Sequence, residues 1–414
     1  MSRLLEDQGK ALLQQAGVPV PRHVVATTPA EARAATQALG VPVMLKALVP
    51  IGGRGKAGGV RPATSAEEAE AVAHDLLGRS LGPYPVERLL IEERLSIAQE
   101  LFVSISFDSS RRCPVILASS EGGVEIEALA RQRPDHVRSL PIDPLLGFHP
   151  YMGKELWARL GLRGAALTGA TEVVTRLVQL FAQVDATILE VNPLAMLADG
   201  RVVAAAVLLA VDDDALYRQP SLQGVVQPGT DRAWRPLTTL ERQAIAVDRA
   251  DPYRGTARYT EMDGGDIGLL SGGGGGSLLV YDTLLQCGGR PANYTEFGGN
   301  PTEEKVYGLV KVILSKPGVR GFLLDANITN NTQTDVVARG LLRAFQELGI
   351  HPATFPVVVR LAGVNEAEAR RLLEQAGIEY HGDDVTMEDA CLVMVEKMRA
   401  APDPGTASPV LGKG

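Results

Sequence analysis

At 414 residues the chain is longer than one ordinary hydrophobic core, so two or three domains are expected. Hydrophobic residues make up 45% and charged residues 22%, as in globular proteins, and no apolar run reaches the ~20 residues that a membrane helix needs. The net charge of −8 argues against nucleic acids and anionic membranes as non-specific partners, because both attract a cationic excess. The three cysteines form no metal or redox pattern and the first residues form no signal peptide, so we expect a cytoplasmic protein.

The first half of the chain mixes helical patterns with antiparallel strands. Helices are expected at 2–16, 29–39 and 168–184, and strands at 41–48, 88–91, 101–107 and 114–119, with a strand pair around the turn at 198–200. The turn at 108–111 joins two of these strands into an antiparallel hairpin. This mixture is not that of a simple doubly wound sheet.

The second half alternates strand and helix regularly. After a connector from 212 to about 261 with one helix at 240–248, strands are expected at 267–270, 291–296, 321–324, 356–360 and 378–380, each followed by a helix. Alternating βα units of this length predict a parallel α/β sheet of the flavodoxin-like type. The tail, 401–414, is rich in Pro, Gly and Ser, and we expect it to be disordered.

A glycine-rich loop at 52–59 follows the strand that carries Lys46. Glycines let a backbone approach an anion and present N–H groups to it, and a lysine within an apolar strand needs a partner. A phosphate is one candidate partner. The loop lacks the Gly-Lys-Ser/Thr ending of a Walker loop. A flexible surface loop beside a lysine that reaches solvent is the alternative.

Four segments occur in the order of one known family. Lys46 with the loop at 52–59, the motif Glu-Gly-Gly-Val-Glu-Ile-Glu at 121–127, Glu-Val-Asn-Pro-Leu at 190–194 and Ala-Leu-Tyr-Arg-Gln-Pro at 215–220 resemble succinyl-CoA synthetase β subunits. The resemblance spans residues 1–400. It implies an α+β ATP-grasp domain at 1–235 with a small subdomain at about 21–105, and a flavodoxin-like CoA-ligase domain at 236–400.

The resemblance implies a nucleotide site in the first domain. Lys46 would contact the nucleotide phosphates, and Glu100 would accept the ribose hydroxyls. The remaining residues implied to bind nucleotide are those of the mobile glycine loop and of the hinge that receives adenine: Gly53, Arg54, Gly55, Glu92 and Leu95. Solvated strand ends are the alternative interpretation of both glutamates.

Glu190 and Asn192 alternate on one strand, so both side chains point to one face and suggest a ligand. The resemblance implies that Asn192 helps to hold Mg²⁺ and that Glu190 acts catalytically near a phosphorylated histidine of a partner subunit. The family has a second metal ligand, an Asp in an Asp-x-Lys arrangement. Ala206 and Leu208 stand at these two positions, and the segment 202–210 has no carboxylate.

Two explanations of this departure remain open. Glu190, or one of the aspartates at 212–214, takes over the metal. Alternatively, phosphoryl transfer is impaired and the chain is a binding or regulatory subunit. The segment 121–127 is expected to be structural.

In the second domain, a five-glycine turn between Ser271 and a helix is expected to bind an anion through backbone N–H groups. A dinucleotide-binding turn is a weaker interpretation. The loop at 326–330 is similar to the Ala-Asn-Phe-Thr-Asn run of ATP-citrate lyase. That resemblance implies substrate or phosphate contacts for the following residues: Ser271, Gly299, Asn327, Thr329, Asn330, Asn331 and Arg360. Helix capping is the alternative role of the Asn and Thr residues.

Together these features predict the β subunit of an ADP-forming carboxylate–CoA ligase that uses ATP and Mg²⁺. Asparagine and threonine in place of glycines favour a polar acid, citrate first, with succinate or malate as alternatives. The six histidines lie in no phosphohistidine motif, so a separate CoA-binding α subunit is expected, in an αβ or α2β2 assembly. The alternative is a nucleotide-binding regulatory or assembly subunit with an impaired metal site.

Overall fold

The computed structural model describes residues 2–123, 126–226, 235–328 and 330–401. Two compact units divide the chain, Met1–Pro236 and Leu237–Gly414. The expected disorder of the tail falls on residues outside the described ranges, apart from residue 401. Within the described ranges, no helix is long and apolar enough to cross a membrane.

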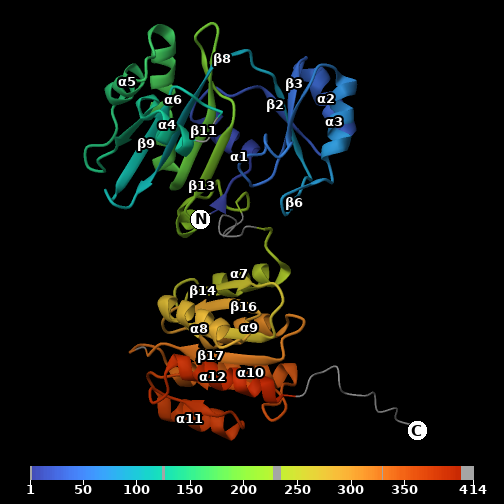
Figure 1. Cartoon of the computed structure of the whole chain (residues 1–414), viewed down its shortest axis with the longest axis vertical. Coiled ribbons are helices and arrows are strands. Elements are labelled where there is room, and N and C mark those ends of the chain that lie inside the picture. Colours follow the sequence, from blue (N-terminus) through green and yellow to red (C-terminus); the bar gives the residue numbers. More distant parts are fainter. Residues whose placement is uncertain (1, 124–125, 227–234, 329, 402–414) are drawn as a thin grey trace. The chain divides into compact units, whose positions relative to one another are not determined.

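The first unit contains a large antiparallel sheet with the strand order β1-β13-β11-β8-β9-β10 and with β12 paired to β11 (Figure 1). Its strands are β1 (Ser2–Arg3), β8 (Ile97–Asp108), β9 (Cys113–Ser119), β10 (Val137–Pro141), β11 (Ala186–Leu197), β12 (Val202–Ala204) and β13 (Val207–Val211). The helices beside it are α1 (Glu6–Gln15), α4 (Ile126–Gln132), α5 (Pro150–Arg159) and α6 (Gly164–Gln183). Trp157, Leu177 and Leu189 belong to the buried core that joins α5 and α6 to this sheet.

A smaller layer in the same unit consists of a four-stranded sheet covered by two helices. The strand order is β2-β7-β3-β4. The elements are β2 (His23–Ala26), α2 (Pro29–Leu39), β3 (Val43–Ala47), β4 (Val60–Ala63), α3 (Ala66–Leu76) and β7 (Leu89–Glu93), and a short ribbon pairs β5 (Ser80–Leu81) with β6 (Tyr84–Pro85). The bounds of α2 follow from local chemistry, because the Thr28 hydroxyl accepts from the Glu31 N–H at 3.2 Å, Pro29 opens the helix and Gly40 ends it with φ +84°.

The second unit is a six-stranded sheet with the order β14-β16-β15-β17-β18-β19. Its strands are β14 (Ala257–Glu261), β15 (Ile267–Gly272), β16 (Asn293–Phe297), β17 (Gly321–Ala326), β18 (Val357–Arg360) and β19 (Tyr380–His381). All neighbours pair in parallel except β14, which is antiparallel to β16. The parallel strands therefore have the 2-1-3-4-5 order of flavodoxin-like folds, with the switch point between β15 and β17.

Helices cover both faces of this sheet, each over its own apolar core. α9 (Glu303–Leu314), α10 (Thr334–Leu348) and α11 (Glu366–Gln375) pack on one face, and α8 (Gly274–Gln286) and α12 (Met387–Ala400) on the other. α7 (Thr239–Ala250) packs against β14 and α9. The predicted α/β class, an antiparallel-rich domain followed by a flavodoxin-like domain, is confirmed.

Three expected boundaries were wrong in ways that matter for the site. The expected strand at 88–91 continues to Glu93, and the one at 101–107 begins at Ile97, so Glu92 and Glu100 lie within strands. After the turn at 198–200, where one strand was expected, the chain forms two, β12 and β13, separated by Ala205 and Ala206, because they pair with different parts of β11.

Candidate functional site: a cleft in the first unit

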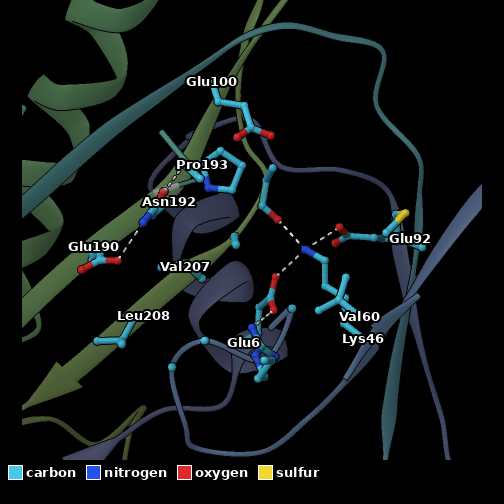
Figure 2. Close-up of a pocket in the computed structure, with 18 of the residues that line it drawn as sticks. Glu6, Lys46, Val60, Glu92, Glu100, Glu190, Asn192, Pro193, Val207 and Leu208 are labelled. Carbon is cyan, nitrogen blue, oxygen red and sulfur yellow. Dashed lines mark hydrogen bonds and ion pairs between the residues drawn. The ribbon is translucent and has the colours of Figure 1, made fainter. Parts of the chain in front are cut away.

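A cavity of about 1360 Å³ lies between the two sheets of the first unit (Figure 2). Its walls come from β3 and the glycine loop, from β7 and β8, and from β11 with the segment 205–208. The cavity is lined by every residue that the sequence assigned to nucleotide or metal in this domain: Lys46, Gly53, Arg54, Gly55, Glu92, Leu95, Glu100, Glu190 and Asn192. Segments as distant as β3 and β11 therefore meet around one space.

Lys46 lies at one wall within a buried network of charges. Its ammonium lies 2.6 Å from a carboxylate oxygen of Glu92 and 3.0 Å from one of Glu6, and it donates to the Ala205 carbonyl at 2.8 Å (Figure 2). Burial alone would lower the pKa of Lys46, but the two carboxylates outweigh burial and raise it. The lysine therefore stays charged although it is only 7% exposed.

The sequence did not assign two members of this network, Glu6 and Lys10 on α1. The Lys10 ammonium is fully buried and contacts Glu6 at 3.0 Å and Glu92. Burial favours the neutral form of the Glu6 carboxyl, but nearby cations, Lys46 first, outweigh burial and lower its pKa. The available signal was spacing, because Glu6 and Lys10 share the buried helix face with Gly9 and Leu13.

Glu92 differs from its expected role at the adenine hinge. Its carboxylate is turned toward Lys46 and Lys10, so it balances charge inside the network. The segment after β7, which includes Leu95, also lines the cavity.

The glycine loop presents an open backbone next to this network. Arg54 donates to the Ala47 carbonyl at 2.9 Å and pairs with Glu6, which fixes the loop to β3 and α1. A Cβ built on Gly53 or Gly55 would meet nothing within 4 Å. Gly53 and Gly55 therefore border open space, whereas the N–H groups of Ala57, Gly58 and Gly59 already donate to carbonyls within the loop.

Glu190 and Asn192 occupy the opposite wall, on β11. The Asn192 amide nitrogen lies 3.5 Å from the Glu190 carboxylate, and its Oδ1 accepts the Gly123 N–H at 2.7 Å. Burial raises the pKa of Glu190. The Asn192 backbone N–H donates to the Ala206 carbonyl at 3.3 Å, so Ala206 lies beside Asn192.

These residues fit a Mg²⁺ ion that takes most of its ligands from phosphates and water. Mg²⁺ in nucleotide sites uses one or two carboxylates with phosphate oxygens and water. Glu190 supplies one carboxylate and Asn192 one amide oxygen, while Ala206 and Leu208 line the cavity without a ligand atom. Across the described ranges, no group of three or more His, Cys, Asp or Glu side chains could hold a metal.

The aspartates at 212–214 do not replace the missing ligand. None of them lines the cavity. The Asp212 carboxylate accepts the Asp214 N–H at 3.0 Å at the start of a 3-10 helix, Asp213–Arg218, and Asp213 accepts a hydrogen bond from Ser2. Of the alternatives for an altered metal site, only Glu190 remains.

In the second unit, predicted substrate residues gather at the switch point of the sheet. A Cβ built on Gly276 would lie 3.2 Å from the Asn327 amide, and one built on Gly299 would lie 3.0 Å from the Asn331 amide, so these loops are in contact. Asn327, Asn330 and Asn331 are exposed, and Thr329 lies outside the described residues.

Ser271 and Arg360 are turned inward instead. The Ser271 hydroxyl donates to the Asp325 carbonyl at 2.6 Å and is fully buried. Arg360 is 5% exposed and donates to the carbonyls of Val385 and Ala326. A direct role of either side chain toward a substrate stays a prediction and would require it to leave these partners.

A carboxylate of the protein, that of Glu296, lies beside the start of α8. Glu296 lies 3.0 Å from the Ser277 hydroxyl and 2.8 Å from the Tyr294 hydroxyl, and Arg258 approaches it at 3.4 Å. This acidic side chain would oppose an anion on its side of the five-glycine turn. An anion would have to bind on the side of the turn that faces Asn327.

Known proteins resemble the chain over nearly its whole length. The ATP-grasp domain family matches residues 3–196, and the ATP citrate lyase citrate-binding family matches residues 237–395. The succinate–CoA ligase [ADP-forming] subunit beta of Rubrobacter xylanophilus is 40% identical over 96% of this chain and 98% of that protein. The succinate–CoA ligase [GDP-forming] subunit beta of Thermus thermophilus is 37% identical over 95% of this chain and 98% of that protein.

Among solved structures, the ATP citrate lyase of Methanothrix soehngenii, in complex with citrate and coenzyme A, superposes with a TM-score of 0.79 at 21% identity. The match covers 95% of this chain and 99% of that chain. At this identity the likeness establishes the fold of both units.

Proposed function

Because the chain belongs to the family of succinate–CoA ligase β subunits, we propose that its first unit binds ATP and its second unit binds the acid in an ADP-forming ligase reaction. The reaction joins an acid and CoA, and converts ATP to ADP and phosphate. One observation carries the proposal. A single cavity gathers a buried charged lysine, an open glycine loop and, on another sheet, Glu100, Glu190 and Asn192.

The nucleotide is oriented by the two walls of this cavity. Lys46 and the loop N–H groups face the phosphates, and Glu100 accepts hydrogen bonds from the ribose hydroxyls. Asn192 and Glu190 would hold Mg²⁺, which would supply positive charge to the transferring phosphate. Burial raises the pKa of Glu190, and no described cation lies within hydrogen-bond distance of its carboxylate. This is consistent with a carboxylate whose partner in the reaction is a positive or protonated group.

The acid binds at the switch point of the second unit. The loops that carry Gly299, Asn327 and Asn331 contact one another there, and amide groups suit the carboxyl and hydroxyl oxygens of a polar acid. The citrate-binding family match covers this unit, whereas the named relatives act on succinate. We favour citrate, with succinate and malate as alternatives.

A panel of acids assayed for CoA-dependent ADP release tests the substrate. Citrate is expected to give the highest kcat/KM, and Asn327→Gly is expected to shift the preference toward succinate, because it removes the amide from the acid site. Gln286→Gly, which removes an exposed amide at the last residue of α8, is the matched control. Succinate as the best acid of the unmodified protein would reject the citrate assignment.

The phosphate passes between the two sites on a histidine of a CoA-binding α subunit. This partner is proposed because the six histidines of the chain lie in no phosphohistidine motif. Co-purification with the candidate α subunit, followed by transfer of the γ-phosphate of labelled ATP to a partner histidine, tests it. Full ligase activity of the isolated chain would contradict a separate partner.

The absent metal ligand favours a second candidate function. Ala206 and Leu208 give the cavity wall no anionic group where the family has an Asp. A nucleotide-binding regulatory or assembly subunit would bind ATP, join its partner and leave the histidine unphosphorylated. The phosphorylation assay separates the two functions directly.

A further inference from the structure

Three described residues of the motif at 121–127 line the cavity, which the sequence did not indicate: Gly123, Ile126 and Glu127. The two glycines of the motif follow β9 and lie where β8 and β11 lose their regular pairing, between Val191 and Leu194. The Gly122 N–H donates to the Glu100 carbonyl on β8 at 2.7 Å, and the Gly123 N–H donates to the Asn192 side chain on β11 at 2.7 Å. Gly122 therefore binds the wall formed by β8, and Gly123 binds the wall formed by β11.

Neither position has room for a side chain. A Cβ on Gly122 would lie 2.3 Å from the Leu101 carbonyl oxygen, so the turn rests directly on the backbone of β8. A Cβ on Gly123 would lie 2.0 Å from a carboxylate oxygen of Glu100, and its φ of +69° is one that glycine adopts without strain. Gly123 thus touches the Glu100 carboxylate on one side and holds the Asn192 amide on the other.

Three further contacts hold the residues just before the turn. Gln99 donates to the Ser120 carbonyl at 2.8 Å, and the Glu121 carboxylate lies 2.8 Å from the His136 ring and pairs with Arg133. The turn is therefore anchored through the residues before it and cannot drift independently of β8.

From this geometry we propose that the turn formed by Gly122 and Gly123 is a positioning element. It fixes the position of the ribose-binding carboxylate of Glu100 relative to the metal-binding amide of Asn192. The inference rests on the proposed nucleotide function and adds a coupling between the ribose contact of Glu100 and the metal contact of Asn192. Displacing the turn from one side chain changes the geometry of the other.

The test compares the dissociation constants of ATP and 2′-deoxy- or 3′-deoxy-ATP by calorimetry with Mg²⁺ present. In the unmodified protein, loss of the hydroxyl that Glu100 binds is expected to weaken binding by about 10-fold to 100-fold, the value of a hydrogen bond to a charged group. Gly123→Ala pushes the Glu100 carboxylate aside, so the discrimination is expected to fall below about 3-fold.

Gly147→Ala is the matched control, because Gly147 also has a positive φ, +72°, and its added Cβ would meet nothing within 4 Å. It imposes the backbone strain without the collision and should retain the discrimination. Gly123→Ala combined with Glu100→Gln should lose less affinity for ATP than the sum of the two single losses, since both changes act in part through the Glu100 side chain.

Asn192→Ala tests the coupling even if Gly123→Ala fails to fold. It removes the acceptor of the Gly123 N–H, and the hydroxyl discrimination is expected to fall although Asn192 does not contact the ribose. The coupling would be overturned if the substitution weakened the binding of ATP and of its deoxy analogues equally. It would also be overturned if Gly123→Ala still discriminated between ATP and deoxy-ATP. Absence of ATP binding by the unmodified protein would instead overturn the proposed function.

Discussion

Asp325 lies at the carboxyl end of β17. Its titration allows the effect of burial on the stability of the second unit to be measured. Its side chain is fully buried, and neither carboxylate oxygen has a hydrogen-bond partner among the described residues. The nearest cation, Arg360, lies 3.7 Å away, beyond hydrogen-bond distance. Burial raises the pKa of Asp325 from 3.8 to about 8 against the opposing effect of Arg360. Asp325 is therefore neutral at pH 7.

The sign and size of the effect follow from this pKa. The unfolded chain loses the Asp325 proton near pH 4 and the folded chain near pH 8, so the folded state binds more protons between these values. The contribution of Asp325 to stability is complete below about pH 4 and is lost as pH rises toward about 8. At about 1.4 kcal/mol per pH unit, the free energy of unfolding falls by roughly 2.7 kcal/mol from pH 5 to pH 7 through this group alone.

Asp325→Asn keeps the shape and removes the titration. Hydrogen exchange of the β17 amides, measured by mass spectrometry between pH 5 and pH 7 after correction for the intrinsic rate, reports this unit separately from the first. The variant is expected to lose the slope and to be the more stable protein at pH 7. Asp263→Asn, an exposed carboxylate in the same unit, should leave the slope unchanged. A loss of about 3–5 kcal/mol at pH 7 in Asp325→Asn would show a charged Asp325 paired with Arg360 and refute the reasoning.

Three other substitutions test the cleft and its support. Lys10→Met removes one of the two lysines that the buried Glu6 and Glu92 share, and leaves Lys46 as the other. It is expected to lower the free energy of unfolding by about 3–5 kcal/mol in urea, whereas exposed Lys154→Met should change it by less than about 0.5 kcal/mol. Ala206→Asp restores an anion beside Asn192 and should strengthen Mg²⁺-dependent nucleotide binding by calorimetry; equal affinity with and without the substitution would mean that this departure is inconsequential. Trp157→Phe removes a buried ring N–H that has no hydrogen-bond partner among the described residues, so thermal unfolding should detect a loss below about 2 kcal/mol, against about 3–5 kcal/mol for Trp157→Ala.

Several features of this protein could be predicted from the sequence because they depend on neighbours in the chain. The cap at Thr28, the proline after it and Gly40 define α2 locally. The alternation of strand and helix after residue 266 implies a parallel sheet, because a crossover helix returns each strand in the same direction.

Only the tertiary structure decided which charges are buried and which glycines are in contact. Glu6 and Lys10 look like an ordinary surface pair on α1 until β3 and β7 enclose them with Lys46 and Glu92. The Gly123 N–H meets a side chain 69 positions later in the chain. Arg360 stands at a strand end, where a contact with substrate or phosphate was expected, but it donates to carbonyls of two other segments. The physical reason is the same in each case: burial and pairing depend on packing between distant segments, and local patterns carry no record of which segments meet.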